Sequence, residues 1–326
     1  MKIFIRKIKD KFKNIKLDIW NIYIINTDIF WRLFSQKNIT LSSIKGASLI
    51  HIKKAPGPYI IAADPYFISE KIILFESIAR GNGNGCIFKY DLSTERYFKL
   101  DLDNSLHYSF PRSFKYNGNT YLTFECHNIK GVCIYLVEDL LSLKLKKVST
   151  DFSSEDKKYR IIDPIIKEEK DGLELRCSCL ESQNREQLVF FADNHRADLK
   201  FKLKKRIILS DCIQEIKGKT MRSAGGELVY QNKDYLPMQM HRDSYGDGVW
   251  LFQEKRRHID QEETVIKVID RSSERCCFGP HTINYSPNRE YIALDLCFKD
   301  IQLFYLKIYW LLIKYFSRVT RLIING

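Results

Sequence analysis

A degenerate unit that recurs five times constrains the fold of this chain more than any single motif does. The units begin at Asp64-Pro65, Phe110-Pro111, Asp163-Pro164, Arg222-Ser223 and Pro280-His281, and successive starts are 46, 53, 59 and 58 residues apart. Each start leads into an apolar stretch, a short polar turn and a second apolar stretch, as in SFKYNGNTYLTFE (113–125). Repeats of about 40 to 50 residues that hold several strands are typical of propeller blades. The sequence therefore predicts an all-β fold, a five-bladed β-propeller.

Turn signals between the apolar stretches support this interpretation. Asn117-Gly118 and Asp171-Gly172 are strong hairpin signals, and 231–234 and 286–289 are longer turns. A two-sheet sandwich is the alternative, but five long similar units are unusual in a sandwich. Residues 20–25 are a candidate closing strand for the last blade, since propellers commonly close by pairing the two ends of the chain.

The positive charge is concentrated in two tails. Residues 1–16 carry +6 and residues 299–326 carry +4, which leaves only +3 of the net +13 for the 282 residues between them. This distribution argues against a nucleic-acid groove on the folded body. Both tails have apolar residues at helical spacing, so we expect basic amphipathic helices at both termini. The expected domains are a basic segment at 1–17, the propeller at 18–298 and a basic helix at 299–326.

The tails indicate a membrane surface rather than a membrane span. No run of 18 uncharged apolar residues exists, whereas Lys307, Lys314, Arg318 and Arg321 form one stripe on the last helix. Such a helix fits the interface of an anionic membrane, and packing on the propeller or on another subunit is the alternative.

Nine cysteines without paired metal spacing, and no signal-peptide pattern, predict free thiols in a reducing compartment. We therefore expect a cytoplasmic protein, peripheral on the inner face of the plasma membrane.

Polar residues at the blade starts would converge on one central funnel. Asp64 and Asp163 head the first and third blades, and Glu125 ends a strand of the second; these three are the catalytic candidates. Carboxylates that meet an Arg and a His can serve general acid–base chemistry or bind sugar hydroxyls and phosphate. An aspartate before a proline can instead cap a turn through its side chain. The candidates for substrate binding are Glu76, Arg222, Gln239, His241, Tyr245, Asp247 and His281. We expect no metal and no cofactor.

The five ordered motifs, ADPYF…LFE, YSFPRSF…NGNTYLTFE, IDPII…DGLEL, RSAGG…YGDG and GPHT, resemble a family of five-bladed propellers over residues 18–298. That family includes the N-terminal domain of plant glucosamine inositolphosphorylceramide transferases, and bacterial propellers associated with formyltransferase-type domains. It is more distantly similar to family 43 glycoside hydrolases. The hydrolase pattern implies that Asp64 is a general base. It also implies an acid where Phe110 stands and a catalytic Glu where Asp163 stands, so the acid set is altered.

The resemblance and the expected location favour glycan assembly over digestion. The leading prediction is a membrane-peripheral glycosyltransferase-like enzyme of bacterial surface polysaccharide or glycolipid biosynthesis, acting in the funnel. Its partners would be an activated sugar donor, a glycan or glycolipid acceptor, an anionic membrane and a partner transferase, with no nucleic acid. No nucleotide-binding glycine loop supports this prediction. A glycoside hydrolase with an altered acid set and a non-catalytic carbohydrate-binding propeller are the alternatives.

Overall fold

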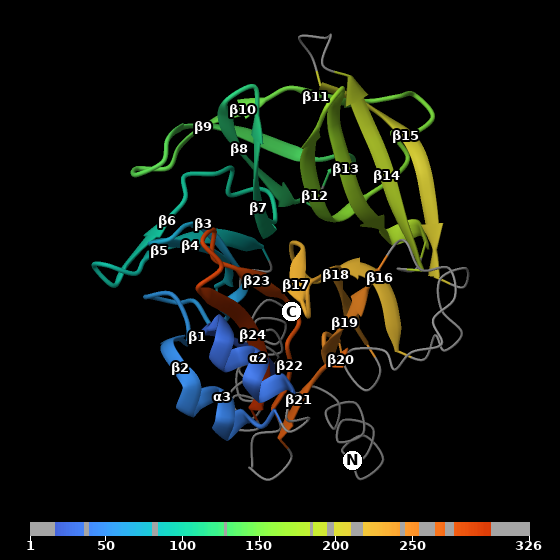
Figure 1. Cartoon of the computed structure of the whole chain (residues 1–326). Helices are drawn as coiled ribbons and strands as arrows, with labels where there is room; N and C mark the ends of the chain where they lie inside the picture. The colour runs from blue at the N-terminus through green and yellow to red at the C-terminus, as the bar shows by residue number, and fades with distance from the viewer. Residues whose placement is uncertain are drawn as a thin grey trace, which may run out of the picture.

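The computed structural model consists of five mainly antiparallel sheets that surround a common axis (Figure 1). The first strands of the sheets lie nearest the axis, because β3 contacts β7, β7 contacts β12, β12 contacts β16 and β23 contacts β3. The fold is the five-bladed β-propeller that the repeats predict. The structure describes residues 17–35, 39–79, 84–126, 129–182, 185–193, 199–209, 218–241, 245–253, 265–270 and 277–300.

Blades 1 and 2 are four-stranded meanders in chain order. Blade 1 contains β3 (Ala63–Ser69), β4 (Ile72–Ile78), β5 (Gly85–Asp91) and β6 (Arg96–Lys99). Blade 2 contains β7 (Ser109–Tyr116), β8 (Asn119–Glu125), β9 (Cys133–Asp139) and β10 (Lys144–Val148). The turn between β7 and β8 is the predicted one, with Asn117 and Gly118 both at positive φ.

Blades 3 and 4 vary this plan. Blade 3 contains β12 (Ile161–Glu169), β13 (Gly172–Cys179), the 3-10 turn η1 (Leu180–Ser182), β14 (Glu186–Asp193) and β15 (Leu199–Ile208), and β11 (Thr150–Phe152) runs parallel to β15. Blade 4 contains β16 (Lys219–Ser223), β17 (Leu228–Tyr230), β18 (Lys233–Met240), β19 (Gly248–Phe252) and β20 (Val265–Ile266). Both β16 and β17 pair with β18, so the inner strand of blade 4 is interrupted.

Blade 5 joins two segments that are far apart in the sequence. It contains β21 (Val268–Asp270), β22 (Cys277–Gly279), β23 (Ile283–Tyr285), β24 (Tyr291–Asp300), β1 (Leu17–Asn26) and β2 (Ser48–Ile52). β1 pairs with β24 along ten residues and with β2 on its other edge. The candidate closing strand at 20–25 therefore closes the ring, as predicted.

Strands that are apolar on both faces explain how the blades pack. In β1, Ile22 and Ile24 join Phe75 of blade 1 in one core, whereas Tyr23 joins Val249 of blade 4 in another. Because successive side chains of a strand point to opposite faces, a strand buried between two neighbouring blades reads as a continuous apolar run. Similar cores lie between blades 1 and 2, 2 and 3, and 3 and 4.

Two short helices connect β1 to β2. They are α2 (Thr27–Ser35) and α3 (Leu41–Ala47), and they cover blade 5 through Phe30, Leu41 and Ile44 (Figure 1). The predicted basic helices at 1–17 and 299–326 fall almost wholly on residues 1–16 and 301–326, outside the described part of the chain. Within the described residues, no helix has the length and apolar content needed to cross a membrane.

Candidate functional site

Three equivalent residues at the starts of blades 1, 2 and 3 share an unusual backbone. Asp64, Phe110 and Asp163 have φ angles of 53°, 49° and 49°, and each precedes a proline. At each one the pairing with the next strand shifts register. A bulge of this kind re-aims a side chain, and left-handed backbone at a non-glycine residue costs about 1–3 kcal/mol. The fold thus maintains a strained conformation at the two aspartates that the sequence singles out.

A second set of residues at similar places lies on the second strand of each blade, near where that strand passes the start of the inner strand: Glu76, Glu125, Ser178, Gln239 and Asp295. Three of them bind the next blade. Oε2 of Glu125 accepts a hydrogen bond from the backbone N–H of Asp163 (3.0 Å), and Oδ2 of Asp295 accepts one from that of Asp64 (2.9 Å). The hydroxyl of Ser178 donates to the carbonyl of Met221 (2.7 Å). Each of these bonds ties the second strand of one blade to the inner strand of the next blade.

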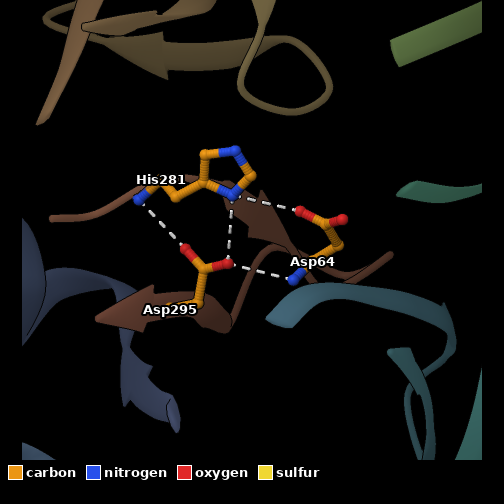
Figure 2. Close-up of side chains that lie close together, drawn as sticks. All are labelled: Asp64, His281 and Asp295. Atoms are coloured by element: carbon orange, nitrogen blue, oxygen red, sulfur yellow. Dashed lines mark hydrogen bonds and ion pairs between the residues drawn. The ribbon is translucent and has the colours of Figure 1, made fainter. Parts of the chain in front are cut away.

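His281 lies between two buried carboxylates. Its Nδ1 is 3.3 Å from Oδ1 of Asp64 and 3.5 Å from Oδ2 of Asp295 (Figure 2). Asp295 also accepts hydrogen bonds from the backbone N–H groups of His281 and Thr282. Oδ2 of Asp64 accepts the backbone N–H of Phe110 (3.1 Å). All three titratable side chains are at most 5% exposed.

Charge pairing outweighs burial in this cluster. Burial alone would lower the pKa of His281, but Tyr245, Asp295 and Asp64 raise it well above its usual 6.5. Burial would raise the pKa of Asp64, but His281 and the Arg112 guanidinium lower it below its usual 3.8. Among the described residues these three side chains are the group whose ligand atoms, within 4.8 Å of one another, could surround a metal ion. Because Nδ1 lies within 3.5 Å of an oxygen of each carboxylate, we interpret the trio as an ion-paired cluster around a protonated imidazole.

Asp163 forms a second cluster with Arg222. Nε of Arg222 donates to Oδ2 of Asp163 (2.6 Å) and Nη2 donates to Oδ1 (2.9 Å), a bidentate pair. Nε2 of Gln239 is 3.4 Å from the same Oδ2, and Oε2 of Glu125 is 3.6 Å from Nη2 of Arg222. Burial raises the pKa of Asp163 to about 7; Arg222 opposes the shift, and the negative charge of Glu125 adds to it. Asp163 and Asp64 are thus driven in opposite directions.

Tyr245 connects the two clusters. Its hydroxyl oxygen is 3.0 Å from Nη1 of Arg222 and 3.0 Å from Nε2 of His281. Its ring lies against the rings of His241 and His281, with centroids 4.7 and 5.0 Å away. The side chain is 45% exposed, in contrast to the buried acids behind it. The five residues Asp64, His281, Tyr245, Arg222 and Asp163 therefore form one connected polar chain.

The remaining candidates lie beside this chain. Oε1 of Glu76 is 3.3 Å from Nε2 of His107, and burial raises the pKa of Glu76, with Asp64 and Glu125 adding to the shift. Nε2 of His241 bonds Oε1 of Gln239 (3.1 Å), and burial together with Arg222 lowers the pKa of His241 to about 4. Asp247 forms an ion pair with Lys267 (3.3 Å).

Sequence reasoning missed two residues of the site. Asp295 ends the blade 5 stretch TINYSPNREYIALD in the place where Glu76 and Glu125 end theirs, so alignment of the repeats could have found it. Arg112 follows Phe110-Pro111 and is 3% exposed, with its guanidinium carbon 3.7 Å from the centre of the Phe110 ring. Its charge acts on Asp64, Asp163 and Asp295, which places a cation among acids of three blades.

Comparison with known proteins gives structural matches only. No protein-family model and no curated protein matches this sequence. Among solved structures, the chain is similar to an α-L-arabinofuranosidase from Lactobacillus brevis (13% identity, TM-score 0.48, 74% of this chain and 85% of that one). It is also similar to the arabinanase Arb43A of Bacillus subtilis (14%, 0.44, 74% and 94%) and to a family 117 glycoside hydrolase from Zobellia galactanivorans (10%, 0.39, 73% and 83%).

These matches correct the leading functional prediction. The similar structures with a named activity are glycoside hydrolases, not transferases, so the prediction of a glycosyltransferase in polysaccharide biosynthesis is wrong. The transferase prediction depended on the basic tails, the inferred compartment and the resemblance to biosynthetic propellers, and none of these is a property of the funnel's own side chains.

Proposed function

We propose that this propeller hydrolyses glycosidic bonds in its central funnel, with Asp64 as general base and Asp163 as general acid. One observation carries the proposal. Two carboxyl groups stand at equivalent bulged positions of blades 1 and 3, and their surroundings drive their pKa values apart. Two such groups with opposite shifts are the usual signature of an acid–base pair.

Each shift suits its role. A base that removes a proton from water must be ionised, and His281 with Arg112 favours the carboxylate of Asp64. An acid must hold a proton near neutral pH, and burial with the charge of Glu125 raises the pKa of Asp163 to about 7. Inverting glycosidases use a pair of this kind on opposite sides of the scissile bond. Glu125, which holds the backbone of Asp163, is then a positioning residue.

A panel of p-nitrophenyl glycosides and unmodified oligosaccharides, including arabinofuranosides, tests the proposal. The wild-type protein should release product from at least one member. Asp64→Asn and Asp163→Asn should each reduce turnover by about 10²–10⁴-fold. Asp101→Asn is the matched control, because Asp101 is exposed between blades 1 and 2. Equal activity in wild type and both funnel variants would overturn the assignment.

A non-catalytic carbohydrate-binding propeller is the second candidate, and one observation favours it. Both oxygens of Asp163 are held by Arg222, and the exposed Tyr245 ring offers a face on which a sugar can stack. Calorimetry separates the two functions. Binding of a glycan that persists in Asp64→Asn, with no product from wild type, would support binding alone.

The tails and the wider resemblance lead to two further proposals. The basic segments at 1–17 and 299–326 would hold the protein on the inner face of an anionic membrane. Liposome binding tests this: full-length protein should bind anionic liposomes in a salt-sensitive way, and a 17–300 truncation should not bind.

The proposed kinship with the propellers of plant glucosamine inositolphosphorylceramide transferases and of formyltransferase-associated proteins rests on the five ordered motifs. An experimental structure of one of those propellers with acids at the equivalent bulges would support it.

A further inference from the structure

The hydroxyl of Tyr245 is surrounded by hydrogen-bond donors. Nη1 of Arg222 lies 3.0 Å from the oxygen, and an arginine nitrogen can only donate. Nε2 of His281 lies at the same distance on another side. Nδ1 of that imidazole lies 3.3 Å and 3.5 Å from carboxylate oxygens of Asp64 and Asp295, and these negative charges favour the protonated, cationic ring. When Nε2 is protonated as well, both neighbours of the Tyr245 oxygen are donors.

The proton of Tyr245 is then left without an acceptor. Among the described residues, the hydrogen-bond partners of this hydroxyl are Arg222 and His281, and neither accepts in that state. The phenol of Tyr245 keeps its proton at neutral pH, because the ordinary pKa of a tyrosine is about 10. Because the side chain is 45% exposed, a ligand in the funnel can reach it.

The surroundings select the kind of oxygen that can use this proton. Both oxygens of Asp163 are already bonded to Arg222, and Asp163 and Asp64 are only 1% and 3% exposed. A sugar hydroxyl placed beside the Tyr245 oxygen would meet two donors, Arg222 and His281, whereas the acceptors Asp64 and Asp163 are buried. A carboxylate only accepts, and it would lie beside two cationic groups, Arg222 and His281.

We propose that the Tyr245 hydroxyl donates a hydrogen bond to the carboxylate of an acidic sugar, so that the funnel takes glycans containing a hexuronic acid. The inference rests on the proposed function, because it takes the ligand to be a glycan. It adds the substrate class, glycans that contain a hexuronic acid. Other groups that face His281 are Trp20, whose ring centroid is 5.0 Å away, and His241, whose charge interacts with it.

Calorimetry with matched sugar pairs tests this without requiring turnover. The probes are methyl glycosides of glucuronic, galacturonic and mannuronic acid, each compared with the hexose of the same configuration at constant ionic strength. Wild type should bind at least one uronate about tenfold or more tightly than its hexose, as expected for a hydrogen bond to a charged group. Tyr245→Phe should abolish that preference, so that the uronate binds no more tightly than its hexose. Tyr97→Phe, on the outermost strand of blade 1, should match wild type.

Every outcome bears on the inference. A preference for the hexose, or a uronate preference that survives in Tyr245→Phe, would overturn it and assign any uronate binding to general positive charge. A uronate preference lost in Tyr245→Phe, in a protein that hydrolyses no glycoside, would retain the inference and remove the proposed hydrolysis. Hydrolysis of neutral glycosides alone, with no uronate preference, would overturn the inference and retain the proposed hydrolysis.

Discussion

Glu125 holds the backbone of Asp163, because its Oε2 accepts a hydrogen bond from the backbone N–H of that residue, with an N–O distance of 3.0 Å. The same carboxylate is 3.6 Å from Arg222, the cation that binds both oxygens of Asp163. One residue of blade 2 therefore controls both the placement of the acid of blade 3 and its electrostatic environment.

Replacing Glu125 by glutamine should lower the pKa of Asp163. The amide oxygen can still accept the backbone N–H, but the negative charge that raises the pKa is lost. In an active enzyme the alkaline limb of the pH profile of kcat/KM should move to lower pH. Carboxyl NMR titration measures the same shift without substrate. Glu138→Gln, on the exposed end of β9, is the control. An unchanged limb and an unchanged Asp163 titration would refute the coupling.

Asp295→Asn should destabilise the fold markedly. The change removes one of two negative charges that pair with His281 in a site where Asp295 is fully buried. Breaking a buried ion pair by removing one partner costs about 3–5 kcal/mol. Urea denaturation measures the loss. Asp101→Asn, an exposed change of the same chemistry, should leave the midpoint unchanged. A midpoint for Asp295→Asn equal to that of the control would contradict the role of the ion pair.

The stability of the protein should depend on pH through His281. Because its folded-state pKa is raised above 6.5, His281 contributes its full stabilisation below about pH 6.5 and loses it as the pH rises through the folded-state value. Asp64 acts in the opposite sense: its contribution is present above about pH 3.8 and is lost as the pH falls through its lowered pKa. In the His281→Asn variant, the decrease in unfolding free energy at alkaline pH that is due to this residue should disappear. Unfolding free energies measured between pH 5 and 10 test this. Parallel pH dependences for wild type and His281→Asn would count against it.

Gly225→Ala should weaken the junction of blades 4 and 5. Gly225 has φ of 150°, and a Cβ atom there would lie 1.9 Å from the carbonyl oxygen of Ile283. The backbone must shift to relieve this overlap, at a cost on the order of 2 kcal/mol. Gly46→Ala is a matched control, since its Cβ would meet nothing within 4 Å and alanine favours the α3 helix. Thermal denaturation should show a lower Tm for the first variant only.

The sequence predicted the architecture well because blade repeats are a local signal. The stretch at 20–25 faces a core on both sides and is therefore apolar along its length, and Asn117-Gly118 determines the type of its own turn. Both features can be recognised from neighbouring residues in the sequence. The site was harder. Asp64 and Asp163 could be selected from their place in the repeat, but their pairing with His281 and Arg222 arises only when blades from distant parts of the chain meet.

Arg112 shows why the rest escaped prediction. In the sequence it is one of 53 basic residues, and no spacing distinguishes it. Its position among acids of blades 1, 3 and 5 is a property of the closed ring alone. The functional prediction failed for a related reason, since it drew on tails that are separate in sequence from every residue of the funnel.

The hydrogen bond from Asp64 to Asp295 has a consequence for biosynthesis. These residues are 231 positions apart, and Asp295 lies on the strand that pairs with β1 to close the ring. During translation the first four blades can be complete while Asp64 still has no partner for its backbone N–H. The funnel therefore cannot acquire its acid–base chemistry on the ribosome until nearly the whole propeller has emerged.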